Sequence, residues 1–238
     1  MKKAKKERLV NDVTFLTSVY PPRNHEHPNS LMKVTKYVED ELGKLGLTVE
    51  YQSWTVNGTE YSNVIYQYLP DKQKRLVIGA HYDVCMDTPG ADDNASAVAG
   101  LLETIRLVNS NALDLTFGID FVFYCLEEPP YFGTEFMGSY IHAQSIAANK
   151  ENILGMICYE MIGYFSDEPG SQKFPHPDLE KIYPNTGNFI MAVSNLKYQE
   201  FNDLVYRGMR KNENMEVYKA NLPSYYGLAG MSDQRNYW

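Results

Sequence analysis

Phe117-Gly-Ile-Asp-Phe-Val-Phe-Tyr-Cys-Leu126 is a nearly continuous apolar run that ends directly at the acidic pair Glu127-Glu128. Runs of this kind are typical of strands buried on both faces of a parallel sheet. A second run, Leu76-Val-Ile-Gly-Ala80, ends in the same way at His81. The segment between the two runs has apolar residues at intervals of three and four over 98–108, which predicts an amphipathic helix.

This strand, helix, strand order predicts the α/β class, with a three-layer architecture and a mixed, mainly parallel sheet flanked by helices. Asn57-Gly58 separates two alternating segments and predicts a hairpin. Residues 1–238 are expected to form one large domain. Spacing predicts further helices at 9–20, 30–45, 139–148 and about 196–211, and further strands at 49–56, 63–69, 153–161 and 189–193.

Charge and composition indicate which kinds of partner and which location in the cell are expected for this protein. The formal charge of −8 argues against a nucleic-acid partner, and no segment has the roughly 18 consecutive apolar residues of a membrane-spanning helix. Cys85, Cys125 and Cys158 are odd in number and lie in or near apolar runs, so free thiols are expected. The basic start lacks an apolar signal region, which predicts a cytoplasmic protein as written, or a secreted or periplasmic one if a leader was removed.

Chemically active side chains follow the predicted strands where each strand ends. His81, the Glu127-Glu128 pair and Glu160 all fall at carboxyl ends, which gather at one edge of a parallel sheet. Alone, His81 is more often a satisfied polar residue, and the acids are typical of solvated strand ends. Together they predict a zinc-type hydrolytic site in which one carboxylate acts as base. Asp83 is placed to accept a ring N–H of His81. The Asp92-Asp93-Asn94 segment supplies either a helix cap, a ligand, or both.

The order H-Y-D, P-G-A-D-D-N-A-S, L-E-E, T-E-x-M-G-S and Y-E-M-I-G-Y resembles the zinc aminopeptidases of metallopeptidase family twenty-eight. The resemblance implies a catalytic domain that binds two zinc ions and hydrolyses peptides with a free N-terminus. By position it implies a bridging ligand at Asp92, with a cis peptide bond between Asp92 and Asp93. The other implied metal ligands are His81, Glu128 and Glu160, and the implied catalytic residues are the general base Glu127 and Asp83.

The resemblance breaks off near the end of the chain. The family has a fifth ligand, a histidine, beyond a Ser-Asp-His motif, whereas here Ser232-Asp-Gln234 is followed only by Arg-Asn-Tyr-Trp238. We therefore expect a chain that lacks the C-terminal strand and helix of the family. The Glu128 site then lacks its imidazole, which leaves activity impaired, and an exposed sheet edge favours self-association. His142 and His176 are considered as substitutes, His142 mainly as a packing residue.

Two other functions are compatible with the same motifs. Glutaminyl cyclases share the fold and use a single zinc ion for acyl transfer, so metal stoichiometry separates them from the aminopeptidases. A metal-free, non-catalytic binding domain of the same superfamily is the alternative outside enzymes. The presence of Glu127 argues against that reading, because a scaffold needs no base.

Overall fold

The computed structural model describes residues 2–223 and 227–238, which form two compact units. The first unit holds the described residues up to 162 together with 232–238, and the second holds those within 163–231. The single domain expected from the sequence stays a prediction. Among the described helices, none combines the length and apolar character required to span a bilayer.

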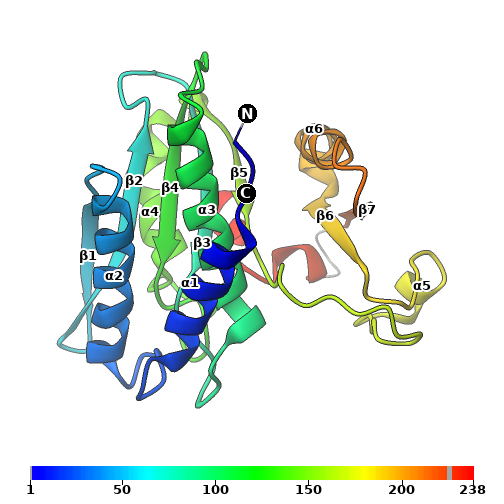
Figure 1. The fold of residues 1–238 in the computed structure, drawn as a ribbon, viewed down its shortest axis with the longest axis horizontal. Coiled ribbons are helices and arrows are strands. Elements are labelled where there is room, and N and C mark those ends of the chain that lie inside the picture. Colours follow the sequence, from blue (N-terminus) through cyan, green and yellow to red (C-terminus); the bar gives the residue numbers. More distant parts are fainter. Residues whose placement is uncertain (1, 224–226) are drawn as a thin grey trace. The chain divides into compact units, whose positions relative to one another are not determined.

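The first unit is built on a five-stranded mixed sheet (Figure 1). Its spatial order is β1 (Glu50–Val56), β2 (Thr59–Tyr68), β4 (Gly118–Tyr124), β3 (Arg75–His81) and β5 (Ile153–Cys158). β1 and β2 are antiparallel, as are β2 and β4, whereas β3 runs parallel to both β4 and β5. The predicted mixed sheet between helices is therefore confirmed. The two parallel pairings bring the carboxyl ends of β3, β4 and β5 to one edge.

Helices cover both faces of this sheet (Figure 1). The helices α1 (Lys6–Ser18), α2 (Pro28–Gly43) and α3 (Ala97–Ser110) share one core with one face of the sheet. Helix α4 (Gly138–Ile146) and a 3-10 turn at Asp233–Tyr237 cover the other face. The three layers arise because each apolar helix stripe and each sheet face needs a partner to exclude water.

Strand β4 shows how the sequence produces two cores. Phe121 and Phe123 are fully buried in the core shared with α1, α2 and α3. Val122 and Tyr124 are equally buried on the opposite face. Because successive strand side chains point to opposite faces, an apolar run without alternation is buried on both.

A cluster of charged side chains joins the first three helices. Arg106 of α3 lies 2.6 Å from Asp12 of α1 and 2.6 Å from Glu41 of α2. Glu103 of α3 accepts a hydrogen bond of 2.8 Å from Arg8 of α1. Asp12, Glu103 and Arg106 are all buried, so the pairs satisfy charges that would be costly alone.

Asn63 links β2 to the start of α4. Its side-chain amide donates to the Gly138 carbonyl at 2.8 Å, and its oxygen accepts from the Cys125 amide at 3.2 Å. The Gly138 amide in turn donates to the Cys125 carbonyl at 2.7 Å. A Cβ at residue 138 would lie 2.1 Å from the Asn63 oxygen, so this close approach requires glycine.

The second unit contains a parallel pair of strands and a connecting helix. β6 (Phe189–Asn195) pairs in parallel with β7 (Glu216–Leu222), and α6 (Gln199–Met209) packs on both. The buried amide of Asn202 donates to the Ala192 carbonyl at 3.0 Å and thereby ties α6 to β6. A short helix, α5 (Pro177–Glu180), precedes β6.

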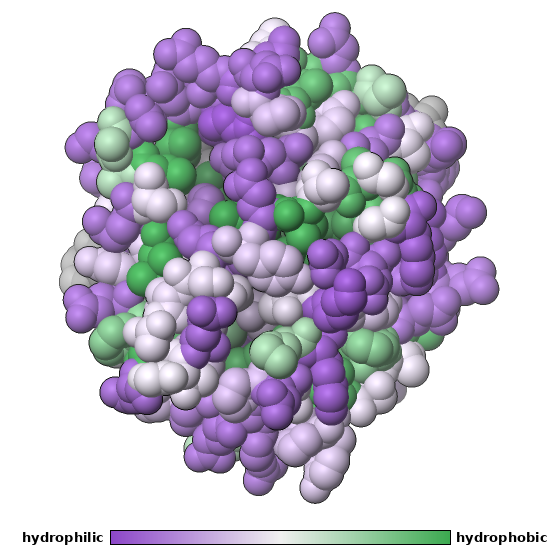
Figure 2. Space-filling model, turned by 90° about the vertical axis from the view of Figure 1, so that its left-hand side faces the viewer, coloured by the Kyte–Doolittle hydropathy of each residue, from purple (hydrophilic) through white to green (hydrophobic). Residues whose placement is uncertain are grey.

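The face drawn in Figure 2 is mainly hydrophilic, and its apolar side chains lie in small separate areas. This distribution is ordinary for a globular protein, since apolar atoms always make up part of the surface. The hydropathy of this face therefore gives no indication of a large binding patch.

Candidate metal centre

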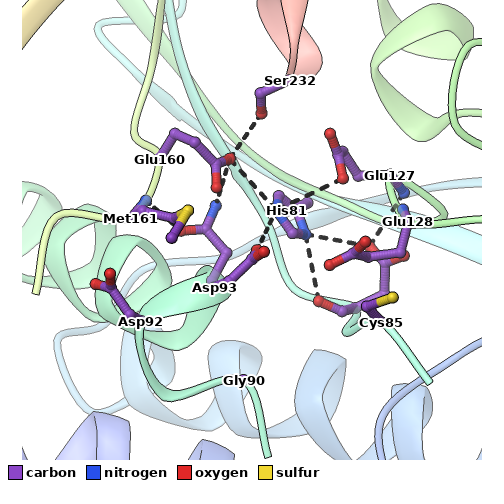
Figure 3. A network of polar contacts seen from close by, with 12 residues as sticks. His81, Cys85, Gly90, Asp92, Asp93, Glu127, Glu128, Glu160, Met161 and Ser232 are labelled. Carbon is purple, nitrogen blue, oxygen red and sulfur yellow. Dashed lines mark hydrogen bonds and ion pairs between the residues drawn. The ribbon is translucent and has the colours of Figure 1, made fainter. Parts of the chain in front are cut away.

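Polar side chains from three strand ends meet at the carboxyl edge of the first unit's sheet (Figure 3). His81 is the last residue of β3, Glu127 and Glu128 follow β4, and Glu160 follows β5. The parallel pairing of β3 with both neighbours is what brings these ends together. The clustering expected from the sequence is therefore present in the structure.

His81 is the centre of the cluster and is only 1% exposed. Its Nε2 lies 3.3 Å from Asp93 Oδ1, 3.3 Å from Glu160 Oε2 and 3.8 Å from Glu127 Oε2. On the other side of the ring, Nδ1 lies 3.2 Å from the backbone oxygen of Asp83. That contact favours the tautomer with hydrogen on Nδ1, which leaves Nε2 free to act as a ligand.

Asp83 contacts His81, as expected, and also holds the next loop. Its Oδ1 lies 3.6 Å from Nδ1 of His81, and its carbonyl oxygen lies closer to the same nitrogen, at 3.2 Å. The carboxylate in addition accepts from the backbone amides of Glu127 and Glu128, at 3.1 and 3.0 Å. Asp83 is 2% exposed, so this double contact fixes the Glu127-Glu128 backbone from within the protein.

The structure brings Asp93, rather than Asp92, to the metal-binding cluster. Asp92 points away from His81 (Figure 3), and its side chain and carbonyl both accept from the Ser96 hydroxyl, at 3.1 and 2.8 Å. Asp93, and not the Asp92 expected from the resemblance, therefore lies beside His81 as the candidate ligand. The cis peptide bond likewise joins Asp93 and Asn94 and not Asp92 and Asp93. Asp93 and Asn94 have non-helical backbone angles, so helical spacing cannot tell which acid faces inward.

Asn94 and Ser232 hold Glu160, and the sequence reasoning assigned neither of them this role. The Asn94 amide donates to Glu160 Oε2 at 3.2 Å and to the Tyr159 carbonyl at 3.1 Å. The Ser232 hydroxyl donates to the same Oε2 at 2.7 Å. Asn94 directly follows Asp93, and Ser232 lies in the Ser-Asp-Gln segment at which the family resemblance breaks off, so both positions stand beside motifs that the sequence shows.

Burial and crowding shift the protonation of this cluster. Burial disfavours the charged form of His81, but the pKa of the ring is raised well above 6.5 because Glu127 and hydrogen bonds to Asp83, Asp93 and Glu160 outweigh burial. Burial also raises the pKa of Glu127 to about 9, and Asp233 and other acids add to this effect against the opposing influence of His81. A carboxyl group with such a pKa holds a proton at neutral pH unless positive charge is added.

Two further acids of the cluster, Glu128 and Asp233, also have raised pKa values. Burial, followed by the neighbouring Asp93 carboxylate, raises the pKa of Glu128 to about 7. Burial also raises the pKa of Asp233 to about 7, partly offset by His81 and by the Ser139 hydroxyl. Asp233 is fully buried, and neither carboxylate oxygen has a well-formed hydrogen bond within the described chain. Sequence reasoning placed Asp233 in a motif but gave it no role.

The donor set fits zinc. Ligand atoms of His81, Asp93 and Glu160 all lie within 4.8 Å of one another, as do those of His81, Glu127 and Glu128. Asp93 Oδ1 and Glu128 Oε1 are buried without a well-formed hydrogen bond, which a cation would satisfy. One imidazole with several carboxylates is a set that zinc accepts. His81 is the single imidazole in both groups, as far as the described residues show.

The two histidines considered as substitutes have other contacts. His142 is 3% exposed, and its Nδ1 lies 2.6 Å from the Tyr237 hydroxyl. Burial lowers the pKa of His142 to about 4, as is typical of a neutral packing residue, which is the role expected for it. His176 belongs to the second unit, where its ring accepts from the Asp178 amide at 3.2 Å and caps α5.

Two non-glycine residues next to the cluster have positive φ angles, which residues with side chains seldom adopt. Leu126 has φ of +62° directly before Glu127, and Met161 has φ of +46° directly after Glu160. A non-glycine residue in this region costs on the order of 1–3 kcal/mol and persists only where neighbouring contacts enforce it. For Leu126 those contacts include full burial in the main core and the Asp83 carboxylate that holds the next two amides.

Comparison with known proteins identifies the family of this chain. The model of peptidase family M28 matches residues 63–215, which include every residue of the cluster except Ser232 and Asp233. The chain belongs to peptidase family M28. The Escherichia coli K12 protein YfbL is 35% identical over 245 residues, a match that covers 99% of this chain and 74% of YfbL.

Solved structures of the family have the same fold. The Legionella pneumophila LapA aminopeptidase superposes with a TM-score of 0.72 at 16% identity, over 98% of this chain and 58% of LapA. The Porphyromonas gingivalis glutaminyl cyclase superposes with a TM-score of 0.65 at 17% identity, over 98% of this chain and 80% of the cyclase. This M28 chain therefore spans less than two thirds of the length of LapA.

Proposed function

We propose that this M28 chain is a zinc-dependent aminopeptidase that removes N-terminal residues from peptides. The observation that carries the proposal is the arrangement of carboxylates on both sides of the His81 Nε2. Asp93 and Glu160 lie on one side and Glu127 on the other, so ligands and a base are held together. A ligand set with an adjacent uncommitted carboxyl group is the arrangement that metal-assisted hydrolysis requires.

His81, Asp93 and Glu160 would hold one zinc ion, and Glu128 with Asp93 would hold a second. Zinc, when bound, polarises a scissile carbonyl and supplies positive charge that keeps neighbouring carboxylates ionised. Glu160 is oriented for this task by Asn94 and Ser232, which both donate to its Oε2. Among the described residues, His81 is the one histidine in the candidate ligand groups. The first ion is therefore expected to bind more tightly than the second, which has only carboxylate ligands.

Glu127 acts as the general base in this proposal. Its side chain is buried to 5% exposure, and its backbone amide donates to Asp83, so the carboxyl group is fixed beside the cluster. The ionised form accepts a proton from the attacking water and then delivers it to the departing amine. A protonated Glu127 cannot accept that proton, so activity requires the ionised form.

The substrate class follows from the charge around the site. Asp93 and Glu160 are partly exposed, with side chains 45% and 29% accessible, while the other acids lie deeper. A free amino terminus carries positive charge, which the many carboxylates around the proposed zinc sites would attract, and this favours cleavage at the end of a peptide over cleavage inside a chain. The aminopeptidase fold of LapA supports the same choice.

The experiment measures zinc content together with hydrolysis of aminoacyl-arylamides and of peptides blocked at the N-terminus. Glu127→Gln should retain zinc and lose about 10²–10⁴-fold in kcat, because general-base catalysis contributes that much. Glu135→Gln is the matched control, since it makes the same change at an exposed acid of the following loop and should leave kcat unchanged. Full activity in Glu127→Gln, or equal cleavage of blocked peptides, would contradict the proposal.

Cyclisation of N-terminal glutamine is the second candidate, supported by the fold of the Porphyromonas gingivalis enzyme. The same preparation should be offered a glutaminyl peptide, and the products should be separated by mass. Formation of pyroglutamyl peptide with one zinc ion per chain, and without release of free amino acids, would assign the cyclase activity. Absence of both zinc and turnover would instead favour a binding domain.

A further inference from the structure

Arg23 is a fully buried cation in the wall of the first unit, close to the metal-binding cluster. Its side chain is 1% exposed, and its four hydrogen bonds go to backbone carbonyls. Nε donates to Tyr82 at 2.8 Å, and Nη1 donates to Leu16 at 3.0 Å and to Pro89 at 2.6 Å. Nη2 donates to Gly90 at 2.7 Å.

Three of these bonds go to the two ends of one loop, residues 82–90, which joins β3 to the turn that carries Asp93. Tyr82 directly follows the ligand His81, and Gly90 lies three residues before Asp93. The Val84 amide in addition donates to the backbone oxygen of Arg23 at 3.1 Å. One side chain and its own peptide group therefore hold the start, the middle and the end of the 82–90 loop.

Gly90 connects Arg23 to the turn that carries Asp93. Its carbonyl accepts from Arg23 and also from the Ala95 amide at 3.0 Å, which closes the turn around Asp93. Gly90 has φ of +57°, and a Cβ there would lie 2.9 Å from Arg23 Nη2 and 2.3 Å from the Asp93 carbonyl. The guanidinium and the Asp93 backbone thus pack against the same glycine.

The guanidinium of Arg23 lies near acidic side chains of the cluster but does not hydrogen-bond to them. Burial lowers the pKa of the guanidinium to about 10, while Asp83, Asp93 and Glu128 act in the opposite direction. The group therefore stays protonated at neutral pH. In the described chain none of its hydrogen bonds goes to a carboxylate, so the acids keep their oxygen atoms available.

We propose that Arg23 is a positioning residue for the metal centre: its guanidinium fixes the 82–90 loop so that Asp93 meets His81. The geometric part concerns the loop alone, and the consequence for zinc rests on the proposed function. The planar fork of donors is essential here, because one ammonium group cannot reach carbonyls at both ends of the loop with the same directions. Lysine should therefore fail to replace Arg23 although it keeps the charge.

The test compares Arg23→Lys with Arg106→Lys, a matched change at another buried arginine of the same unit that contacts none of the cluster. Amide hydrogen exchange of the metal-free chains is read at Val84 and Ala95, whose amides are bonded in the loop. Arg23→Lys should accelerate exchange at these two amides by about tenfold or more, the effect of losing one or two hydrogen bonds. Arg106→Lys should leave them unchanged.

Zinc affinity, measured by competition with a chromophoric chelator, provides the second readout. Arg23→Lys should bind zinc about tenfold or more weakly than the parent, and Arg106→Lys should bind within about twofold of it. A parent chain without zinc affinity would defeat the proposed function, while the exchange data would still decide the role of the loop. Unchanged exchange in Arg23→Lys, or acceleration spread over the whole unit, overturns the positioning role even if zinc binds.

A folding failure is also decisive. Arg23→Gln is the second variant, since it keeps a planar polar group without charge, and it should resemble Arg23→Lys at Val84 and Ala95. If neither Arg23 variant folds under conditions in which Arg106→Lys folds, Arg23 is a core residue and the proposal fails.

Discussion

His81 can serve two groups of carboxylates because its two ring nitrogens face different surroundings. Nδ1 contacts a backbone carbonyl, which fixes the ring, and Nε2 faces Asp93, Glu160 and Glu127. Without a cation, burial keeps a proton on Glu127, and the neighbouring carboxylates raise the pKa of the imidazole so that it takes positive charge. The buried cluster therefore favours a divalent ion over the metal-free state.

The distinction between Asp92 and Asp93 gives a sharp test at the scale of single residues. Asp93→Asn should lower zinc affinity by about 10–100-fold, because it removes one ligand carboxylate that faces His81. Asp92→Asn makes the same chemical change one residue away, at a side chain that contacts Ser96, and should bind zinc like the parent. Zinc titration of both variants checks this expectation, and a stronger effect from Asp92→Asn would restore the original assignment.

The sequence predicts which side chains gather at the carboxyl ends of the strands but not the details of their contacts. Apolar runs predict the buried parallel strands, and the carboxyl ends of such strands lie at one edge of the sheet. The residues at these ends are therefore expected to lie together, namely His81, Glu127, Glu128 and Glu160. The choice between two adjacent aspartates depends on the irregular backbone of Asp93. No periodic pattern describes such a turn, and for the same reason the role of Arg23 could not be predicted.

At the scale of elements, the junction after β4 depends on Asp83. Its two carboxylate oxygens accept the amides of Glu127 and Glu128, and they do so where Leu126 has positive φ. Local contacts of this kind hold a strained backbone in place. The loop after β3 therefore supports the loop after β4, and the parallel pairing of the two strands makes this possible.

Asp83→Asn should destabilise the first unit by about 1–3 kcal/mol, since one backbone amide would then face an amide donor instead of an acceptor. Asp87→Asn is the control, because Asp87 is an exposed acid in the same loop. Urea unfolding of both variants and the parent gives the difference. Equal stability of Asp83→Asn and the parent would show that the amides have other acceptors.

Helices and strands with strong patterns were predicted close to their observed bounds. The hairpin at Asn57-Gly58 is confirmed, with both residues at positive φ as this turn requires. The strand β7 was not predicted. Its sequence Glu-Val-Tyr-Lys-Ala-Asn-Leu has charged and exposed positions, and its pairing with β6 is set by a partner more than twenty residues away. Patterns within a short window do not contain that information.

At the scale of the whole molecule, His142 links stability to pH. Burial lowers its pKa from 6.5 to about 4, so the unfolded chain binds a proton between these values and the folded chain does not. Keeping His142 neutral in the folded protein contributes to the free energy of unfolding. This contribution is complete above pH 6.5 and is lost as the pH falls toward 4. A gap of this size corresponds to about 3 kcal/mol.

The measurement is the free energy of unfolding in urea at pH 7 and pH 4.5, for the parent and for His142→Gln. Other acids titrate in both chains, so the difference in slope between them isolates the histidine. The parent should lose more stability on acidification than His142→Gln does. Identical pH dependence would mean that the folded protein accommodates the charged ring.

The contact between Asn63 and Gly138 has a consequence for how the sequence can drift during evolution. Because even a methyl group at position 138 would overlap the asparagine oxygen, neither site can change freely while the other stays. A pooled mutational library selected only for folded protein should return glycine at 138 almost without exception. A smaller residue in place of Asn63 should not rescue other residues at 138, because the added Cβ would still lie 2.7 Å from the Cys125 backbone oxygen.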